Sequence, residues 1–125
     1  MFFVLATVFV PLVSAAQEVP QLTEPVNDFA AVIDSSSKSE MEMLIRSLQQ
    51  ASGDVVVVAT VDTFQPYADI REYAVKLFQN GGRGIGERGK DNGLLIVLAV
   101  KDRQVWVEVG YGLASLTLIS DQLLG

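Results

Sequence analysis

The spacing of apolar residues predicts an amphipathic helix near the start of the folded region. In the segment 35–53, SSSKSEMEMLIRSLQQASG, apolar side chains recur three, four, seven and ten positions apart. This spacing places them on one face of a helix. Ser37 and Glu40 form the S-x-x-E pattern of a capping box, and Gly53 suits the end of the helix. Such a helix needs an apolar surface to pack against.

Two uninterrupted apolar runs predict buried strands. The run 55–61, VVVVATV, is rich in β-branched residues and too short for a helix, and 94–100, LLIVLAV, is similar. A second helical stripe over 70–78, preceded by a D-x-x-E capping pattern, lies between them. The run 105–109, VWVEV, alternates after the short polar turn 101–104, so it is expected to pair with the preceding strand as a hairpin.

This order of elements predicts an α/β fold. A strand, a helix and a second strand make a parallel βαβ unit, and the hairpin adds an antiparallel strand, so the small sheet is mixed. Strands that are apolar on both sides need helices on both faces of the sheet, which predicts a three-layer α/β/α sandwich. Residues 26–34 are interpreted as an irregular lead-in, and 113–125 as the approach to a helix capped near Ser120.

Residues 1–16 are interpreted as a secretory signal peptide. The segment 2–13, FFVLATVFVPLV, has no charge and is followed by small residues that a signal peptidase would accept. It is shorter than the roughly 20 residues of a membrane span, so we expect an exported protein (periplasmic, secreted or lumenal) with no stable span in the mature domain. No Lys or Arg precedes the run, and a buried element of the fold is the alternative. Residues 17–25 are expected to be a tether and 26–125 the domain.

The composition narrows the chemistry that the domain can perform. The chain of 125 residues has a net charge of −6. An acidic domain of this size is a poor candidate for nucleic-acid binding and a reasonable one for a cation, although solubility alone also explains the charge. Because the chain has no cysteine and no histidine, the metal we expect is a hard one bound by oxygens, Ca²⁺ or Mg²⁺.

The stretch 83–93, RGIGERGKDNG, contains a G-x-G-x-x-G pattern that ends at Gly89. In a dinucleotide-binding fold these glycines follow a strand and precede a helix, whose free N–H groups meet the phosphates. Here they follow a helix and precede a strand, so no nucleotide is expected. Lys90 is followed by Asp91 rather than by Ser or Thr, so the stretch is not a Walker loop either. It is interpreted as a connection that folds around the edge of the sheet.

Three aspartates are candidate ligands of the cation. Asp91 precedes the strand 94–100, and the hairpin returns the segment 110–121 to the same edge of the sheet, so we expect Asp91 and Asp121 to come within reach of each other. Asp28 lies in the lead-in segment. Each has a simpler interpretation: Asp91 as a turn former, Asp121 as a helix cap and Asp28 as an Asx turn.

Three positive side chains lie shortly before Asp91 in the sequence, Arg83, Arg88 and Lys90. They could attract phosphate or could simply be solvated, and both interpretations stay open. A phosphatase without His or Cys needs metal-bound water or an aspartate nucleophile. Asp91 is then the candidate catalytic residue, and Arg83 or Arg88 the phosphate clamp.

The segment 83–113, RGIGERGKDNGLLIVLAVKDRQVWVEVGYGL, closely resembles the central signature of the TPM domain family, and VNDFAAVID and VVVVATV also match. The resemblance spans 26–125. It implies a Rossmann-like α/β/α sandwich, exported across a membrane, with further helix beyond residue 125. Members of the family include a thylakoid-lumen protein with acid-phosphatase activity, proteins tied to photosystem II repair and a receptor accessory protein.

The resemblance also implies a Ca²⁺ or related cation held by acidic residues. The matching positions are Asp28, Asp91 and Asp121, with Asn92 as a lesser candidate. The family often has glutamate after G-Y-G-L, where this chain has Ala114. The implied function is an exported cation-binding module that assists the assembly or turnover of membrane or envelope protein complexes. The alternative is a metal-dependent acid phosphatase acting on phosphate monoesters.

Overall fold

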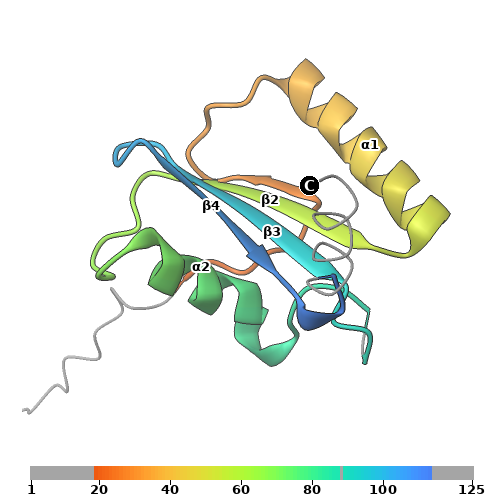
Figure 1. Cartoon of the computed structure of the whole chain (residues 1–125). Helices are drawn as coiled ribbons and strands as arrows, with labels where there is room; N and C mark the ends of the chain where they lie inside the picture. Colours follow the sequence, from red (N-terminus) through yellow and green to blue (C-terminus); the bar gives the residue numbers. More distant parts are fainter. Residues whose placement is uncertain (1–18, 88, 114–125) are drawn as a thin grey trace, which may run out of the picture.

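The computed structural model describes residues 19–87 and 89–113, which fold around one four-stranded sheet (Figure 1). In chain order the elements are β1 (Val26–Asp28), α1 (Ser35–Ser52), β2 (Val55–Val61), α2 (Ile70–Gln79), the short 3₁₀ turn η2 (Asn80–Gly82), β3 (Gly93–Ala99) and β4 (Gln104–Val109). The helices and strands predicted within the described part are all present, and the helix expected near Ser120 lies outside it.

The sheet is mixed, as predicted, with the strand order β1-β2-β3-β4. β1 and β3 both run parallel to β2, and β4 pairs with β3 as an antiparallel hairpin. The lead-in segment was expected to be irregular, and this is wrong for Val26–Asp28, which pairs with Val58–Thr60. A strand of three residues is too short to show an alternating pattern in the sequence.

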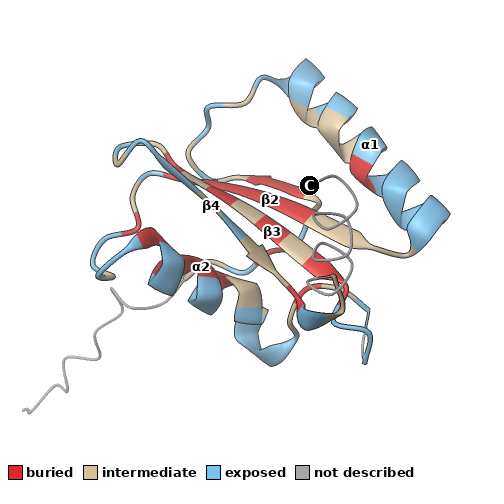
Figure 2. Ribbon diagram, in the orientation of Figure 1, coloured by how far each residue is buried: buried red, intermediate tan, exposed pale blue. Residues whose placement is uncertain are grey.

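The two helices cover opposite faces of the sheet, which confirms the three-layer α/β/α arrangement (Figure 1). On one face Leu77 of α2 packs with Leu95 and Val97 of β3, and these three side chains are almost fully buried. On the other face Ile45 of α1 packs against Val58 of β2. The buried side chains are concentrated in the middle strands (Figure 2).

The two parallel crossovers differ in hand. The chain advances from β1 to β2 and from β2 to β3 in the same direction across the sheet. Because α1 and α2 lie on opposite faces, only one of these crossovers can be right-handed. Parallel crossovers are right-handed in nearly all proteins, so one of these two is an uncommon connection.

Capping side chains define where both helices begin. The carboxylate of Asp34 accepts a hydrogen bond from the backbone N–H of Ser37 at 3.0 Å, so Asp34 caps α1 and the predicted cap at Ser37 is wrong by one turn. Asp69 caps α2 through the N–H of Glu72, as its pattern predicts. α1 ends at Gly53, which has a φ of 81°.

The segment before β1 is packed against the folded part. The backbone N–H of Leu22 donates to the side-chain oxygen of Asn80 at 2.9 Å, and the side-chain amide of Asn80 donates back to the carbonyl of Leu22. Leu22 is buried in the core under α2. Within the segment expected to be a tether, burial and hydrogen bonds therefore hold the part around Leu22 to the end of α2.

The predicted signal peptide, residues 1–16, lies outside the described residues. Among the helices of the described part, none is long and apolar enough to cross a membrane.

Candidate functional site

Three backbone segments meet at the edge of the sheet where β3 begins. The N–H of Gly110 donates to the carbonyl of Gly93 at 2.7 Å, and the N–H of Gly112 donates to the carbonyl of Asp91 at 2.9 Å. The chain after β4 thus folds back over the start of β3. This confirms the predicted return of the segment after β4 to the edge that carries Asp91.

Four glycines make this approach possible. A Cβ atom on Gly86 would lie 2.7 Å from the backbone nitrogen of Gly93. Cβ atoms on Gly93, Gly110 and Gly112 would overlap the carbonyl oxygens of Ile85, Asp91 and Lys90. We call these four residues, Gly86, Gly93, Gly110 and Gly112, the glycine cluster. The G-x-G-x-x-G stretch thus packs closely at the edge of the sheet, and Gly86 is the member of that pattern that takes part.

Asp91 lies at the centre of this edge and points outward. Its φ is 48°, a left-handed conformation that aspartate tolerates better than most residues. Its backbone carbonyl is bonded to Gly112, whereas its side chain is exposed and makes no hydrogen bond or ion pair within the described part. A rigid backbone therefore presents a carboxylate whose oxygens remain available.

Asn92 next to it has a structural function. Its side-chain oxygen accepts a hydrogen bond from the N–H of Glu87 at 2.9 Å, and its side-chain amide donates to the carbonyl of Gly53 at 2.7 Å. Asn92 is buried and joins the end of α1 to the loop before β3. Its amide oxygen is already used, which weakens its candidacy as a metal ligand.

Asp28 organises the turn that follows β1. One carboxylate oxygen accepts hydrogen bonds from the hydroxyl of Thr60 at 2.6 Å and the N–H of Val32 at 3.0 Å, and the other accepts from the N–H of Ile33 at 3.0 Å. The hydrogen bond from Thr60 and those from the backbone lower the pKa of Asp28 below 3.8, against a smaller opposing effect of burial. These contacts match the simpler interpretation of Asp28 as an Asx-type turn residue.

The structure does not bring Asp28 and Asp91 together. Asp28 lies level with Thr60, and Thr60 pairs with Leu98 near the end of β3, whereas Asp91 precedes its first residue. At 3.3 Å per residue the two aspartates are separated by about 16 Å or more along the strands. Asp121 lies outside the described residues. No group of three or more acidic side chains converges on one point within the described part.

The predicted phosphate-binding side chains are dispersed. Lys90 forms an ion pair with Glu87 at 2.8 Å, and this hydrogen bond and the negative charge raise the pKa of Lys90. Arg83 is exposed at the end of η2, and Arg88 lies outside the described residues. The positive charge next to Asp91 is therefore partly neutralised by Glu87.

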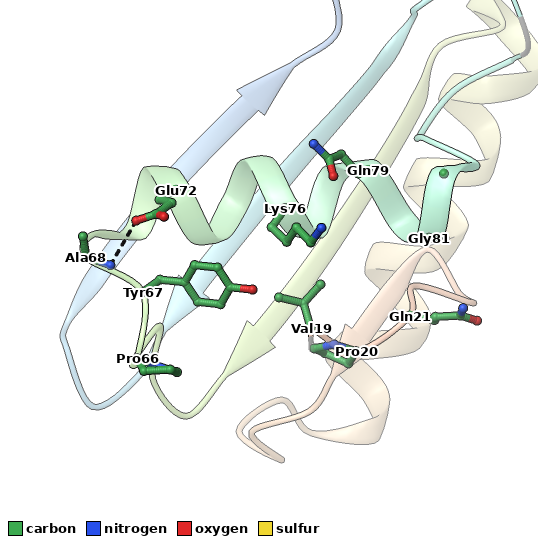
Figure 3. A pocket seen from close by; sticks show the side chains of 11 residues that line it. Val19, Pro20, Gln21, Pro66, Tyr67, Ala68, Glu72, Lys76, Gln79 and Gly81 are labelled. Carbon is green, nitrogen blue, oxygen red and sulfur yellow. Dashed lines mark hydrogen bonds between the residues drawn. The ribbon is translucent and has the colours of Figure 1, made fainter. Parts of the chain in front are cut away.

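Two hollows lie away from Asp91. The larger, about 1060 Å³, is formed by the segment that begins at Val19, the loop around Tyr67 and the side of α2 that carries Lys76 (Figure 3). The smaller, about 230 Å³, lies between Ile45 of α1, residues 22–25 and residues 84–86. Asp91 lines neither of them. No pattern in the sequence indicates the larger hollow, because it depends on the packed position of residues 19–22.

These features define a mixed α/β domain in which glycines pack a carboxylate-bearing turn against the end of a hairpin. Residues 26–124 match the family model of the TPM domain, whose short name contains the word phosphatase. The chain belongs to the TPM domain family, as the resemblance of its central segment predicts.

Several solved structures are similar to this chain, and two of them are described here. One is the N-terminal domain of a protein from P. gingivalis, with 28% sequence identity, a TM-score of 0.64 and coverage of 74% of this chain and 57% of that one. The other is the N-terminal domain of the cg2496 protein from Corynebacterium glutamicum, with 21% identity, a TM-score of 0.57 and coverage of 76% and 60%. Because its sequence identity is only 21%, the structure from Corynebacterium glutamicum supports the fold and nothing further. The chain covers less than two thirds of either structure, and no curated protein matches it.

The glycine cluster predicts that two glycine-to-alanine substitutions lower the free energy of unfolding by very different amounts. In Gly110→Ala the new methyl group would overlap the carbonyl oxygen of Asp91, and we expect the free energy of unfolding to fall by about 3 kcal/mol. Gly84 has a φ of 70° but open space around it, so Gly84→Ala should cost only about 1 kcal/mol. Urea denaturation measures both. Equal losses would contradict the proposed close approach of the backbones.

The contacts of Asp28 predict a pH dependence of stability. Because the pKa of Asp28 is lowered in the folded state, its stabilising contribution is present above pH 3.8 and is lost as the pH falls below that value. Thr60→Val removes the largest cause of the shift, so the pKa of Asp28, followed by carboxyl ¹³C NMR, should rise. An unchanged pKa in this variant would refute the assigned hydrogen bond. Asp28→Asn should remove this part of the pH dependence.

Proposed function

We propose that this domain is an exported interaction module that binds a divalent cation, Ca²⁺ in the first place, through the carboxylate of Asp91. The observation that carries the proposal concerns this carboxylate: the glycine cluster holds the backbone of Asp91, and its side chain is exposed and makes no hydrogen bond or ion pair within the described part. Hard cations prefer such oxygens.

The ligand set that we propose is smaller than the one the sequence implied. Asp28 is removed from it by its distance from Asp91, and the side-chain oxygen of Asn92 is already bonded to Glu87. Asp121 lies outside the described residues and stays in the set as a proposal, because residues 110–112, which precede it in the chain, return to the edge that carries Asp91. Ca²⁺ takes six to eight oxygen ligands, so water would supply much of the coordination sphere and binding would be weak. A weak site that shares ligands with a partner suits an interaction module.

Tyr111 supports the choice of an interaction module. It directly follows the glycine cluster residue Gly110, and 87% of its surface is exposed. Exposed aromatic side chains are enriched at protein interfaces, where they supply much of the binding energy. A tyrosine beside an available carboxylate gives a small patch that a partner could cover. With the proposed export signal, we infer a partner among membrane or envelope proteins.

The second candidate is a metal-dependent acid phosphatase acting on phosphate monoesters, and the short name of the family model favours it. In this function Asp91 would act as nucleophile or hold a metal, and Arg83 would bind phosphate. The ion pair between Lys90 and Glu87 works against it, because it reduces the positive charge that would attract a phosphate. The interaction module therefore remains the preferred proposal.

The cation site predicts a local response to Ca²⁺. In a titration followed by amide NMR, residues 90–93 and 110–113 should shift, and Asp91→Asn should weaken binding by about tenfold or more through the loss of a charged ligand. Asp28→Asn is the matched control and should leave the affinity unchanged, since Asp28 lies at the other end of the sheet. Shifts that survive Asp91→Asn, or that centre on Asp28, would refute the proposed site.

A phosphatase assay separates the two candidate functions. Hydrolysis of a phosphate monoester is measured at acid pH with and without Ca²⁺ or Mg²⁺, for the unaltered chain and for Asp91→Asn. The interaction module predicts no turnover above that of the buffer with the same metal. Turnover that requires metal and is lost in Asp91→Asn would instead establish the phosphatase.

A further inference from the structure

Strand β4 leaves one edge of the sheet unpaired in the described part. The strand order is β1-β2-β3-β4, so β4 pairs with β3 on one side and no described strand pairs with its other side (Figure 1). The opposite edge of the sheet is β1, which has only three residues, whereas β4 has six. An unpaired edge offers a row of backbone N–H and C=O groups to another strand, so β4 is the longer of the two edges available for pairing.

The register of the hairpin decides which backbone groups of β4 point outward. The N–H of Gly110 donates to the carbonyl of Gly93, and in an antiparallel ladder bonded pairs alternate with pairs that are not bonded. Counting back in twos from Gly110, the even-numbered residues of β4 direct their backbone groups to β3: Gln104, Trp106 and Glu108. The odd-numbered residues direct theirs away from the sheet: Val105, Val107 and Val109. We call the backbone N–H and C=O groups of these three valines the outer edge.

The outer edge lacks the features that usually prevent strand pairing. Exposed edges of soluble proteins are commonly protected by proline, lysine or a β-bulge. The sequence of β4, QVWVEV, contains neither proline nor lysine, and its pairing with β3 is continuous from Gln104 to Val109. Val105 is 59% exposed and Val107 46% exposed. Within residues 19–87 and 89–113, no other segment forms a hydrogen bond with the outer edge. A β-branched edge of this kind favours the addition of a further strand.

We propose that the outer edge pairs with the outer edge of a second copy of this chain, antiparallel and with Val107 on the two-fold axis. The two four-stranded sheets then form one continuous sheet. Val107 lies opposite Val107 of the second copy, and Val105 lies opposite Val109 of the second copy. Each valine exchanges N–H and C=O bonds with the residue opposite it. This inference does not depend on the proposed cation site.

The side chains of β4 are complementary to themselves in this register. On one face of the joined sheet valine meets valine. On the other face Trp106 lies opposite Glu108 of the second copy, and within one chain the indole N–H of Trp106 already donates to the carboxylate of Glu108 at 2.9 Å. Residues directly opposite each other on neighbouring strands stabilise a sheet when they are apolar or polar partners, and like charges there destabilise it.

Neighbouring registers are less favourable, which selects the axis at Val107. An axis at Glu108 would place two carboxylates opposite each other, a destabilising pair. An axis at Trp106 would place Val109 opposite Arg103, which precedes the first residue of β4. Only the axis at Val107 matches the three valines of the outer edge among themselves. This self-complementarity is what a symmetric interface between two identical chains requires, and it favours a second copy over a foreign segment as the occupant.

Amide hydrogen exchange in the unaltered chain tests the pairing directly. In dilute solution the N–H groups of the outer edge should exchange rapidly, whereas those of Trp106 and Glu108 should exchange slowly because they are bonded to β3. Raising the protein concentration from about 20 μM to about 1 mM should slow exchange at the outer edge at least about tenfold. Exchange at Trp106 and Glu108 is the internal control and should stay unchanged. Sedimentation of the same samples should show a dimer at the higher concentration.

The absence of cysteine from the chain allows a test of the register. In Val107→Cys the two thiol-bearing residues face each other across the axis, about 5.5 Å apart between Cα atoms. In Val105→Cys they are about 13 Å apart, because four residues along the strand separate them. A thiol cross-linker of matching length should therefore join Val107→Cys chains at least about tenfold faster than Val105→Cys chains. Val105 is the more exposed of the two, so random collision would give the opposite order.

Three results would overturn the proposal. Exchange at the outer edge that stays rapid at about 1 mM would show that no second copy binds there. Slow exchange that is independent of protein concentration would show that the chain itself covers the outer edge. Cross-linking of Val105→Cys as fast as that of Val107→Cys would contradict the two-fold axis at Val107.

Discussion

The close approach of three backbone segments around the start of β3 is the constraint on which the rest of the domain depends. The carbonyls of Gly93 and Asp91 bond to the N–H groups of Gly110 and Gly112, so the loop before β3 and the chain after β4 are held as one unit. Any side chain at the glycine cluster would separate them. The hairpin, the buried strand and the orientation of Asp91 are therefore fixed by the same contact.

Asp28 and Asp91 differ in whether their carboxylates are used within the fold or remain available to a ligand. Asp28 uses both carboxylate oxygens to organise a turn, and the lowered pKa of its side chain reflects those hydrogen bonds. Asp91 has its backbone bonded and its side chain outside the contact. Two aspartates that match the same family pattern thus have different physical roles, and the sheet keeps them about 16 Å or more apart.

The sequence predicted those parts of the fold that depend on periodic patterns. The runs 55–61 and 94–100, the hairpin and the return of the chain to Asp91 follow from strand length, branching and connection length. The sequence did not predict the short strand β1 or the cap at Asp34. Each depends on a few contacts and leaves no periodic pattern of apolar residues in the sequence. The grouping of Asp28 with Asp91 failed for a related reason, since strand register decides at which end of the sheet a residue lies.

The pairing of Leu22 with Asn80 determines how the domain would respond to a mechanical load. Leu22 is held by two hydrogen bonds to one side chain at the end of α2 and by its burial in the core. A force applied through the preceding chain would therefore reach α2 and its core contacts before it reached the central strands β2 and β3. A domain attached by its N-terminal side would yield first at this peripheral contact, and the edge that carries Asp91 would keep its geometry.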